Sequence, residues 1–155
     1  MEKIIEIYTD GSSLGNPGPG GWGVVITQGD KIITELGGYE KDTTNNRMEL
    51  SAVIEALKFI IKKYPKDKVI IHADSTYVLG GVTTWIHNWE KNGWKTANKK
   101  PVLNKDLWQE LIALVREFKG ELSWQKVKGH DGHIHNERAD IIATECSSLQ
   151  RKHIL

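Results

Sequence analysis

This chain of 155 residues contains one cysteine and four prolines. It also lacks long apolar runs and a large excess of either charge. Its single cysteine, Cys146, cannot form an intrachain disulfide, which argues against a small secreted scaffold and favours a reducing compartment. The 15 glycines and 4 prolines are too few for a low-complexity chain. No apolar run approaches the roughly 20 residues that cross a bilayer, and the N-terminus lacks a signal-like segment. These absences predict a soluble, cytoplasmic protein with no membrane partner.

The chain has the size of one ordinary domain, spanning 1–155, in which 147–155 form a C-terminal tail without a clear pattern. Its net charge of +1 gives no bulk attraction to a polyanion. Between Val78 and Lys105, however, five lysines stand against one acid, and three of the six tryptophans lie in the same stretch. This local patch is typical of a phosphate-backbone contact surface, although such lysines can be merely solvated and such tryptophans can be helix core.

Alternating and periodic apolar positions predict a mixed α/β domain. Residues 3–8 alternate as a strand that ends at Thr9-Asp10-Gly11, and two β-branched segments, 24–26 and 32–36, predict a hairpin. A helix with capping residues at 43–46 is expected to stop at Pro65. The later elements expected are a strand over 69–72, helical segments near Tyr77 and over 83–92 separated by Gly80 and Gly81, a helix over 107–118, a strand over 122–127 and a helix over 136–146. This order predicts antiparallel N-terminal strands followed by a parallel strand-helix-strand unit.

Four carboxylates stand near the ends of these expected elements. Asp10 and Asp74 end two strands, Glu49 begins the first long helix, and Asp140 lies in the last helix. Each acid alone is most simply a cap or a solvated turn residue. If the two strands are neighbours, their acids converge at one end of the sheet, and clustered carboxylates repel one another unless they hold hard divalent cations. Two such ions about 3.5–4 Å apart would form a site for in-line displacement at phosphorus.

Two other motifs suggest different chemistry. The run Gly18-Pro-Gly20-Gly-Trp-Gly23 satisfies the G-x-G-x-x-G pattern of dinucleotide sites, but a β-branched run follows where that site needs a helix N-terminus. We interpret these glycines as a tight turn whose backbone can approach a ligand closely. His130, His133 and His135 could bind zinc, although structural zinc sites often use thiolates and the chain has one. A solvated loop, or one histidine that assists acid–base chemistry, is the alternative.

Six ordered motifs resemble bacterial type 1 ribonuclease H. They are Tyr8-Thr-Asp10-Gly-Ser, Gly15-Asn-Pro-Gly-Pro-Gly-Gly-Trp22-Gly, Thr43-Thr-Asn-Asn-Arg-Met-Glu49-Leu, Asp74-Ser-Thr-Tyr77-Val, Trp85-Ile-His-Asn-Trp89 with Gly93-Trp-Lys-Thr, and Val127-Lys-Gly-His130-Asp-Gly-His133 with Asn136-Glu-Arg-Ala-Asp140. The match runs in consistent order from about Ile5 to Ala143. It implies a ribonuclease H-like α/β fold: a five-stranded mixed sheet, with three antiparallel N-terminal strands plus parallel strands, flanked by helices and carrying a basic protrusion called the handle.

The same resemblance implies the reaction. Enzymes of this family are endonucleases that hydrolyse the RNA strand of RNA/DNA hybrids and leave 3′-hydroxyl and 5′-phosphate ends. The residues that match the family's Mg²⁺ ligands are Asp10, Glu49, Asp74 and Asp140. They would hold two Mg²⁺ ions, with Mn²⁺ as a substitute, and Asp10 would bridge the two. One ion would activate the attacking water and the other would stabilise the leaving 3′-oxygen, while His130 would carry a proton or help product to leave.

Recognition of a hybrid requires different contacts to its two strands, because only one of them carries 2′-hydroxyls. Similarity to the family assigns contacts in the minor groove, on the RNA side and the bases, to Gly11, Asn16, Asn45 and Asn46. Thr44 resembles the family's pocket for a DNA phosphate, and Trp85 would pack against a deoxyribose. The DNA backbone would be held by Lys91, Lys95, Lys99 and Lys100. Such contacts predict affinity that falls steeply with salt, for a protein expected to act as a monomer.

Two departures from the family pattern bear on this recognition. Thr76 stands where close relatives usually have Gln, and the handle contains Glu90-Lys91-Asn92 where relatives are often fully basic. Both departures predict weaker hybrid binding and a steeper loss of affinity with salt.

Three other functions stay open at this point. A hybrid-binding module without chemistry is disfavoured by the repulsive acidic cluster. A transposase, integrase or exonuclease of related fold also arranges carboxylates around metals, and would process DNA-only substrates. A zinc-dependent hydrolase would use the histidines at 130, 133 and 135 and would purify with stoichiometric zinc.

Overall fold

The computed structural model describes residues 4–127 and 133–153. Its elements follow in the order β1 (Ile4–Ser13), β2 (Gly18–Gln28), β3 (Lys31–Thr43), α1 (Asn45–Lys63), β4 (Lys68–Ala73), α2 (Thr76–Gly80), the π-helical turn η1 (Gly81–Trp85), α3 (Ile86–Lys91), α4 (Lys105–Glu117), β5 (Glu121–Lys126) and α5 (Ile134–Leu149). In the described ranges, no helix combines the length and apolar character that a bilayer crossing requires.

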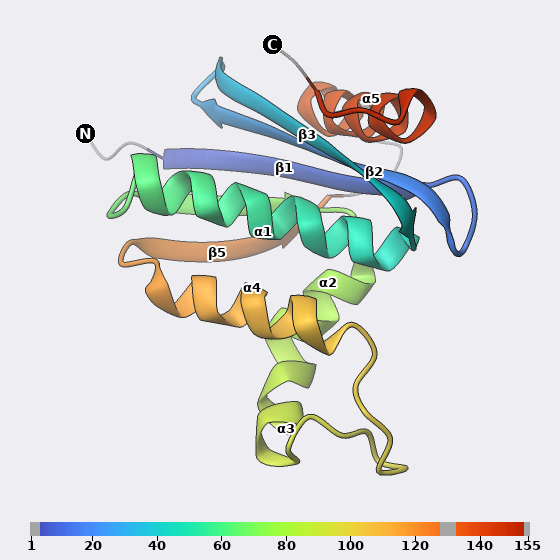
Figure 1. Ribbon diagram of the computed structural model, residues 1–155. Coiled ribbons are helices and arrows are strands. Elements are labelled where there is room, and N and C mark those ends of the chain that lie inside the picture. The colour runs from blue at the N-terminus through green and yellow to red at the C-terminus, as the bar shows by residue number, and fades with distance from the viewer. Residues whose placement is uncertain (1–3, 128–132, 154–155) are drawn as a thin grey trace.

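Five strands form one mixed sheet in the order β3-β2-β1-β4-β5. The first three strands are antiparallel neighbours, whereas β4 runs parallel to β1 and β5 runs parallel to β4. The predicted antiparallel start and the parallel strand-helix-strand unit are therefore confirmed. Figure 1 shows α1 and α4 on one side of the sheet and α5 on the other.

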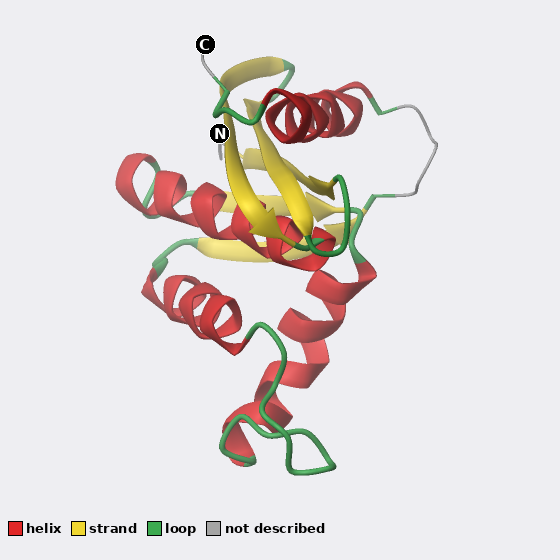
Figure 2. Cartoon of the chain, turned by 45° about the vertical axis from the view of Figure 1, so that its right-hand side comes forward, coloured by secondary structure: helices red, strands yellow, loops and turns green. Residues whose placement is uncertain are grey.

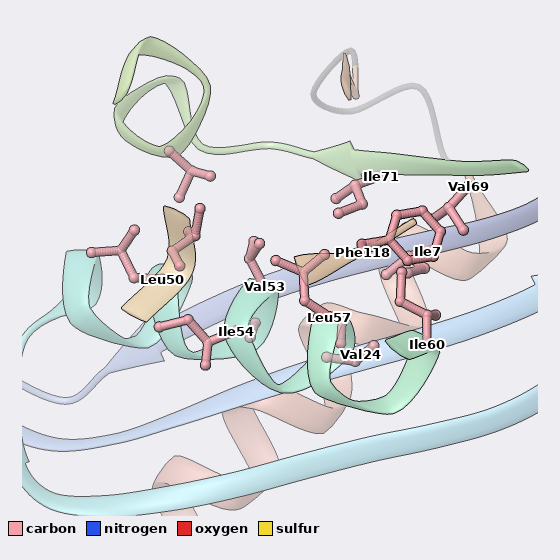
Figure 3. Packing of buried hydrophobic residues seen from close by; sticks show 14 of the residues in the cluster. Ile7, Val24, Leu50, Val53, Ile54, Leu57, Ile60, Val69, Ile71 and Phe118 are labelled. Atoms are coloured by element: carbon pink, nitrogen blue, oxygen red, sulfur yellow. The ribbon is translucent and has the colours of Figure 1, made fainter. Parts of the chain in front are cut away.

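Each face of the sheet has its own core. The larger core lies under α1 and α4, where Leu57 and Ile60 of α1 pack with Ile7, Val24 and other fully buried strand residues (Figure 3). The smaller core lies under α5 and consists of Tyr8, Val25, Ala139, Ile142 and Cys146. Burial of this apolar surface on both faces is the main force that holds the helices against the sheet.

The glycine-rich segment 18–23 belongs to β2 and does not form the tight turn expected from the sequence. Gly23 pairs with Asp10, and β1 continues to Ser13, so Asp10 lies within its strand instead of at its end. Helix α5 approaches this part of the strand closely, because a side chain on Gly23 would collide with the backbone oxygen of Ala139, and one on Gly21 with that of Ala143. Gly21 and Gly23 therefore serve helix-on-sheet packing, which is one of the uses of glycine inside a strand.

Gly80 and Gly81 do not break the helical path that was expected to stop there. Both have right-handed helical dihedral angles, and the chain passes from α2 through η1, where the N–H of Ile86 donates to the carbonyl of Gly81 five residues earlier. The ring of Trp108 occupies the position that a side chain on Gly81 would need. Beyond η1, α3 and the following loop protrude from the body of the protein (Figure 2).

Helix α5 is longer than the expected 136–146 and includes residues 147–149. After it, the backbone N–H of His153 donates to the carbonyl of Gly37 in β3 over 3.1 Å. The side chain of His153 lies 3.0 Å from Oε1 of Glu35. The two oxygens of the Glu35 carboxylate also accept one hydrogen bond each from Arg138 of α5. The described part of the C-terminal segment thus packs against the sheet.

Candidate active site

The parallel pair β1 and β4 brings Asp10 and Asp74 to one edge of the sheet. Thr9 pairs with Ala73, the last residue of β4, so Asp74 follows β4 at the level where Asp10 still lies in β1. Neighbouring strands therefore place these two acids together, as the sequence predicts, although Asp10 belongs to a longer strand than expected.

Glu49 reaches the same place because α1 crosses β1 at Gly11. A side chain on Gly11 would collide with the backbone of Met48 and Glu49, so the two main chains touch there. This approach buries Glu49, which is 6% exposed, beside Asp10. The fourth acid, Asp140, comes from α5 and lies close enough to Asp10 to raise its pKa. Four acids from four separate elements thus lie around one point.

Burial and mutual repulsion change the acidity of this cluster. Burial raises the pKa of Asp10 from 3.8 to about 7, and its hydrogen bond with Asp140 adds to the rise. The hydrogen bonds from Glu49 and from the backbone N–H of Gly11, the latter 2.9 Å long, lower it in part. The pKa of Glu49 is raised well above 4.5 by burial and by the charge of Asp10, with a smaller effect of Asp74. The cluster therefore retains protons near neutral pH that a bound cation would displace.

The donor chemistry of the cluster fits a hard divalent cation. Glu49 Oε2 is buried and has no hydrogen-bond partner among the described residues. Carboxylate oxygens of this kind are the ligands that Mg²⁺ uses in proteins. In the described ranges, no three His, Cys, Asp or Glu side chains are already arranged to hold a metal ion. The oxygens match Mg²⁺ in kind, and binding would require the carboxylates to rearrange around the ion.

An open cavity of about 300 Å³ lies beside the acids. It is lined by Asn45, Asn46, Glu49, Asp74, Ser75, Thr76 and Tyr77. The asparagines come from the first turn of α1, which Thr44 caps by accepting the N–H of Arg47 over 3.3 Å. Ser75 caps α2 in the same way through the N–H of Val78. The two helix starts therefore present both their polar side chains and the acids to one opening.

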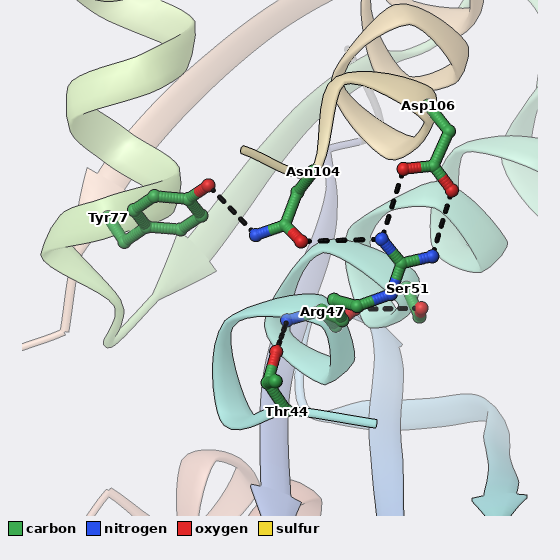
Figure 4. A network of polar contacts seen from close by, with 6 residues as sticks. All are labelled: Thr44, Arg47, Ser51, Tyr77, Asn104 and Asp106. Atoms are coloured by element: carbon green, nitrogen blue, oxygen red, sulfur yellow. Dashed lines mark hydrogen bonds and ion pairs between the residues drawn. The ribbon is translucent and has the colours of Figure 1, made fainter. Parts of the chain in front are cut away.

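A polar network connects these two helix starts to α4 (Figure 4). Arg47 donates two hydrogen bonds to Asp106, of 3.0 and 2.8 Å, and a third to Asn104. Asn104 in turn donates to the hydroxyl of Tyr77 over 3.1 Å, and Trp108 donates to the same hydroxyl over 2.9 Å. Sequence reasoning missed this network, because its hydrogen-bonded pairs lie 27 to 59 residues apart and carry no local signal.

The remaining proposed contacts lie away from the acids. Asn16 is exposed in the connection between β1 and β2. The protruding segment carries Trp85, 38% exposed, and the exposed lysines 91, 95, 99 and 100. Glu90, the one acid of this basic stretch, accepts two hydrogen bonds from Arg116 of 2.6 and 2.8 Å, which also lower its pKa. Its charge is therefore offset within the protein, which weakens the expectation of a less basic handle.

His130 lies outside the described residues. His133 caps α5 by accepting the N–H of His135, and both rings pack against Tyr8, with ring centroids 4.8 and 5.3 Å from it. The opposite side of this group is His72, which stacks on Tyr8 at 4.6 Å. The described histidines are thus engaged in packing and capping, and the arrangement gives no support to the zinc alternative.

Comparisons with known proteins identify the relatives of this chain. The family model for RNase H matches residues 2–148. Ribonuclease H of Thermosynechococcus vestitus is 55% identical over 150 residues, which cover 97% of this chain and 92% of that protein.

Solved structures show the same fold. LC9-RNase H1, a type 1 RNase H with the type 2 active-site motif, superposes with a TM-score of 0.85 at 34% identity, covering 98% of this chain and 75% of that one. LC11-RNase H1, solved in complex with an RNA/DNA hybrid, gives a TM-score of 0.72 at 28% identity, covering 94% and 98%. Fold and sequence thus lead to the same group of proteins.

Proposed function

The chain belongs to the RNase H family, and from this premise we propose that it cleaves the RNA strand of RNA/DNA hybrids by two-metal-ion hydrolysis, giving 5′-phosphate and 3′-hydroxyl ends. The observation that carries the proposal is the group of Asp10, Glu49 and Asp140, which come from three elements, lie close enough to change one another's acidity and meet beside Asp74. A protein that only bound nucleic acid would gain nothing from a buried, repulsive group of this kind.

The four acids would bind the cations through both buried and exposed carboxylate oxygens. Two Mg²⁺ ions, or Mn²⁺ in their place, would supply activation of the attacking water and stabilisation of the leaving 3′-oxygen when bound by Asp10, Glu49, Asp74 and Asp140. Glu49 contributes a buried, unpartnered oxygen, and Asp10 gives up its proton on binding. Asp74 and Asp140 are exposed and face incoming substrate. His130 is proposed to shuttle a proton or to assist product release.

Hybrid recognition is proposed to use the cavity for one strand and the protrusion for the other. Gly11, Asn16, Asn45 and Asn46 would contact the minor groove on the RNA side, and Thr44 a DNA phosphate. Gly11 has no side chain, so its contact would be made by the backbone. Trp85 would pack against a deoxyribose, where a 2′-hydroxyl would clash. The exposed lysines 91, 95, 99 and 100 would hold the DNA backbone. A monomeric state and a cytosolic location stay predictions from the sequence.

The substrate test uses end-labelled RNA/DNA, RNA/RNA and DNA/DNA 12-mers with Mg²⁺ or with excess EDTA. We expect cutting of the RNA strand in the hybrid alone, abolished by EDTA, with products that a 3′-hydroxyl-dependent polymerase extends. Asp74→Asn should lose this activity, whereas Asp30→Asn, in the exposed turn between β2 and β3, should keep it. Cleavage of DNA/DNA would favour the transposase, integrase or exonuclease alternative. Binding of hybrid without any cleavage would favour the binding-module alternative.

A further inference from the structure

Gly80 occupies a position where glycine is a poor choice for the backbone alone. It is the last residue of α2 and leads directly into η1, with φ −61° and ψ −41°. Any L-residue adopts these right-handed helical angles. Glycine weakens a helix relative to alanine, because it loses more conformational freedom on folding. The reason for glycine here must therefore come from what packs against it.

The side chain of Trp85 fills the space that a residue larger than glycine would use. A Cβ on Gly80 would lie 2.8 Å from both Cη2 and Cζ2 of the indole, which is too close for carbon atoms. In an α-helix, residues five apart point about 140° away from each other. The π-helical turn η1 changes this relation, because i→i+5 hydrogen bonding widens the turn and brings residues five apart nearer to the same side of the helix. The wide turn and the missing side chain together place the outer ring of Trp85 against the helix backbone.

Other aromatic rings complete the support under Trp85. Its ring centroid lies 5.9 Å from that of Tyr77 and 6.0 Å from that of Trp89. Tyr77 is itself fixed by the hydrogen bonds that its hydroxyl accepts from Trp108 and Asn104. Trp85 nevertheless stays 38% exposed, so part of the residue remains accessible to a ligand.

The geometry points to Gly80 as a positioning residue that sets how closely the indole of Trp85 lies to the helix, and thereby how tightly the DNA strand of a hybrid is held. This inference rests on the proposed function, in which Trp85 packs against a deoxyribose. A methyl group on Gly80 would push the indole outwards, into the space that the sugar would occupy. Gly80 lines neither the cavity nor the acidic cluster in the described residues, so its effect should be on binding and not on chemistry.

A double-mutant cycle isolates this effect. Gly80→Ala is made in the parent chain and in Trp85→Phe, since phenylalanine lacks the outer ring atoms that touch Gly80. Hybrid cleavage gives kcat and KM, and thermal unfolding checks the fold. We expect Gly80→Ala to raise KM about 3- to 10-fold relative to the parent, which is part of the cost of losing an aromatic stacking contact. Its kcat should stay within about 2-fold of the parental value, and its Tm should be equal or higher. In Trp85→Phe the same change should raise KM by less than about 1.5-fold.

Three results would overturn the inference. They are an unchanged KM in Gly80→Ala, an equal rise of KM in the Trp85→Phe background, and a fall of kcat together with Tm. Failure of the proposed function looks different, because the parent chain itself would then not cleave the RNA strand of the hybrid, whether or not it binds it. Gly81→Ala provides a structural contrast: its methyl group would enter the ring of the fully buried Trp108, so Tm should fall clearly.

Discussion

Replacement of Asp10 by asparagine should stabilise the metal-free protein, and the gain should depend on pH. In the folded protein the pKa of Asp10 is raised from 3.8 to about 7. The folded state therefore keeps this proton over a range where the unfolded chain has released it, and stability falls as pH rises from about 4 to about 7. Above pH 7 the whole penalty is present, and the shift corresponds to about 4 kcal/mol.

Asparagine removes the charge but keeps the oxygen that accepts the N–H of Gly11. We therefore expect Asp10→Asn to raise the free energy of unfolding by about 2–4 kcal/mol at pH 8. At pH 4.5 the gain should be at most about 1 kcal/mol, because the folded parent keeps the proton there and the penalty has only begun to develop. The assay is urea unfolding in EDTA at both pH values. Saturating Mg²⁺ should stabilise the parent, because the bound cation takes the place of the proton on the Asp10 carboxylate. It should not stabilise Asp10→Asn, which lacks that carboxylate.

The matched control is Asp30→Asn, which removes one negative charge at an exposed turn and should change stability by less than about 0.5 kcal/mol at either pH. The reasoning would be refuted by an Asp10→Asn variant that is no more stable than the parent at pH 8. It would equally be refuted by a gain of the same size at pH 4.5, which would show that the effect does not come from ionisation.

The other predictions concern packing and the handle. Tyr77→Phe removes the acceptor for two donors, Trp108 Nε1 and Asn104 Nδ2, and should cost about 1–3 kcal/mol in urea unfolding; no loss would mean that the network contributes nothing to stability. Gly23→Ala should destabilise by about 1–3 kcal/mol because its methyl group meets α5, and an unchanged Tm would contradict that packing. Lys99→Gly should stabilise by about 1 kcal/mol, since Lys99 has φ 62°, while lowering the slope of log affinity against log salt by about 0.9 if Lys99 contacts one phosphate. A parental salt slope would remove Lys99 from the hybrid interface.

The sequence predicts the parts of this molecule that depend on local pattern. The alternation of β1 and the helical spacing of α1 are both visible along the chain, and their order places Asp10, Glu49 and Asp74 near one edge of the sheet. The extension of β1 past Asp10 was not predicted, because it pairs with the glycines of β2, whose role in packing against α5, more than 100 residues away, is not visible along the chain. Strand glycines and turn glycines look alike until the partner helix is known.

The same limit applies to the support of the site. The contact of Arg47 with Asp106 spans 59 residues, and neither residue belongs to a pattern that indicates the other. The π-helical turn also escaped prediction, since Gly80 and Gly81 are typical of a helix break. Both glycines instead leave room for tryptophan rings. Tertiary packing, which one sequence does not display, decided each of these features.

The most direct test of the central claim compares the parent chain with Asp10→Asn on one labelled RNA/DNA hybrid, measuring binding in Ca²⁺ and cleavage in Mg²⁺. If the acidic cluster is the catalytic metal site, the variant stays folded, binds the hybrid as the parent does within about 3-fold, and loses at least about 100-fold in cleavage rate. Cleavage by Asp10→Asn at the parental rate would show that the chemistry takes place without this cluster.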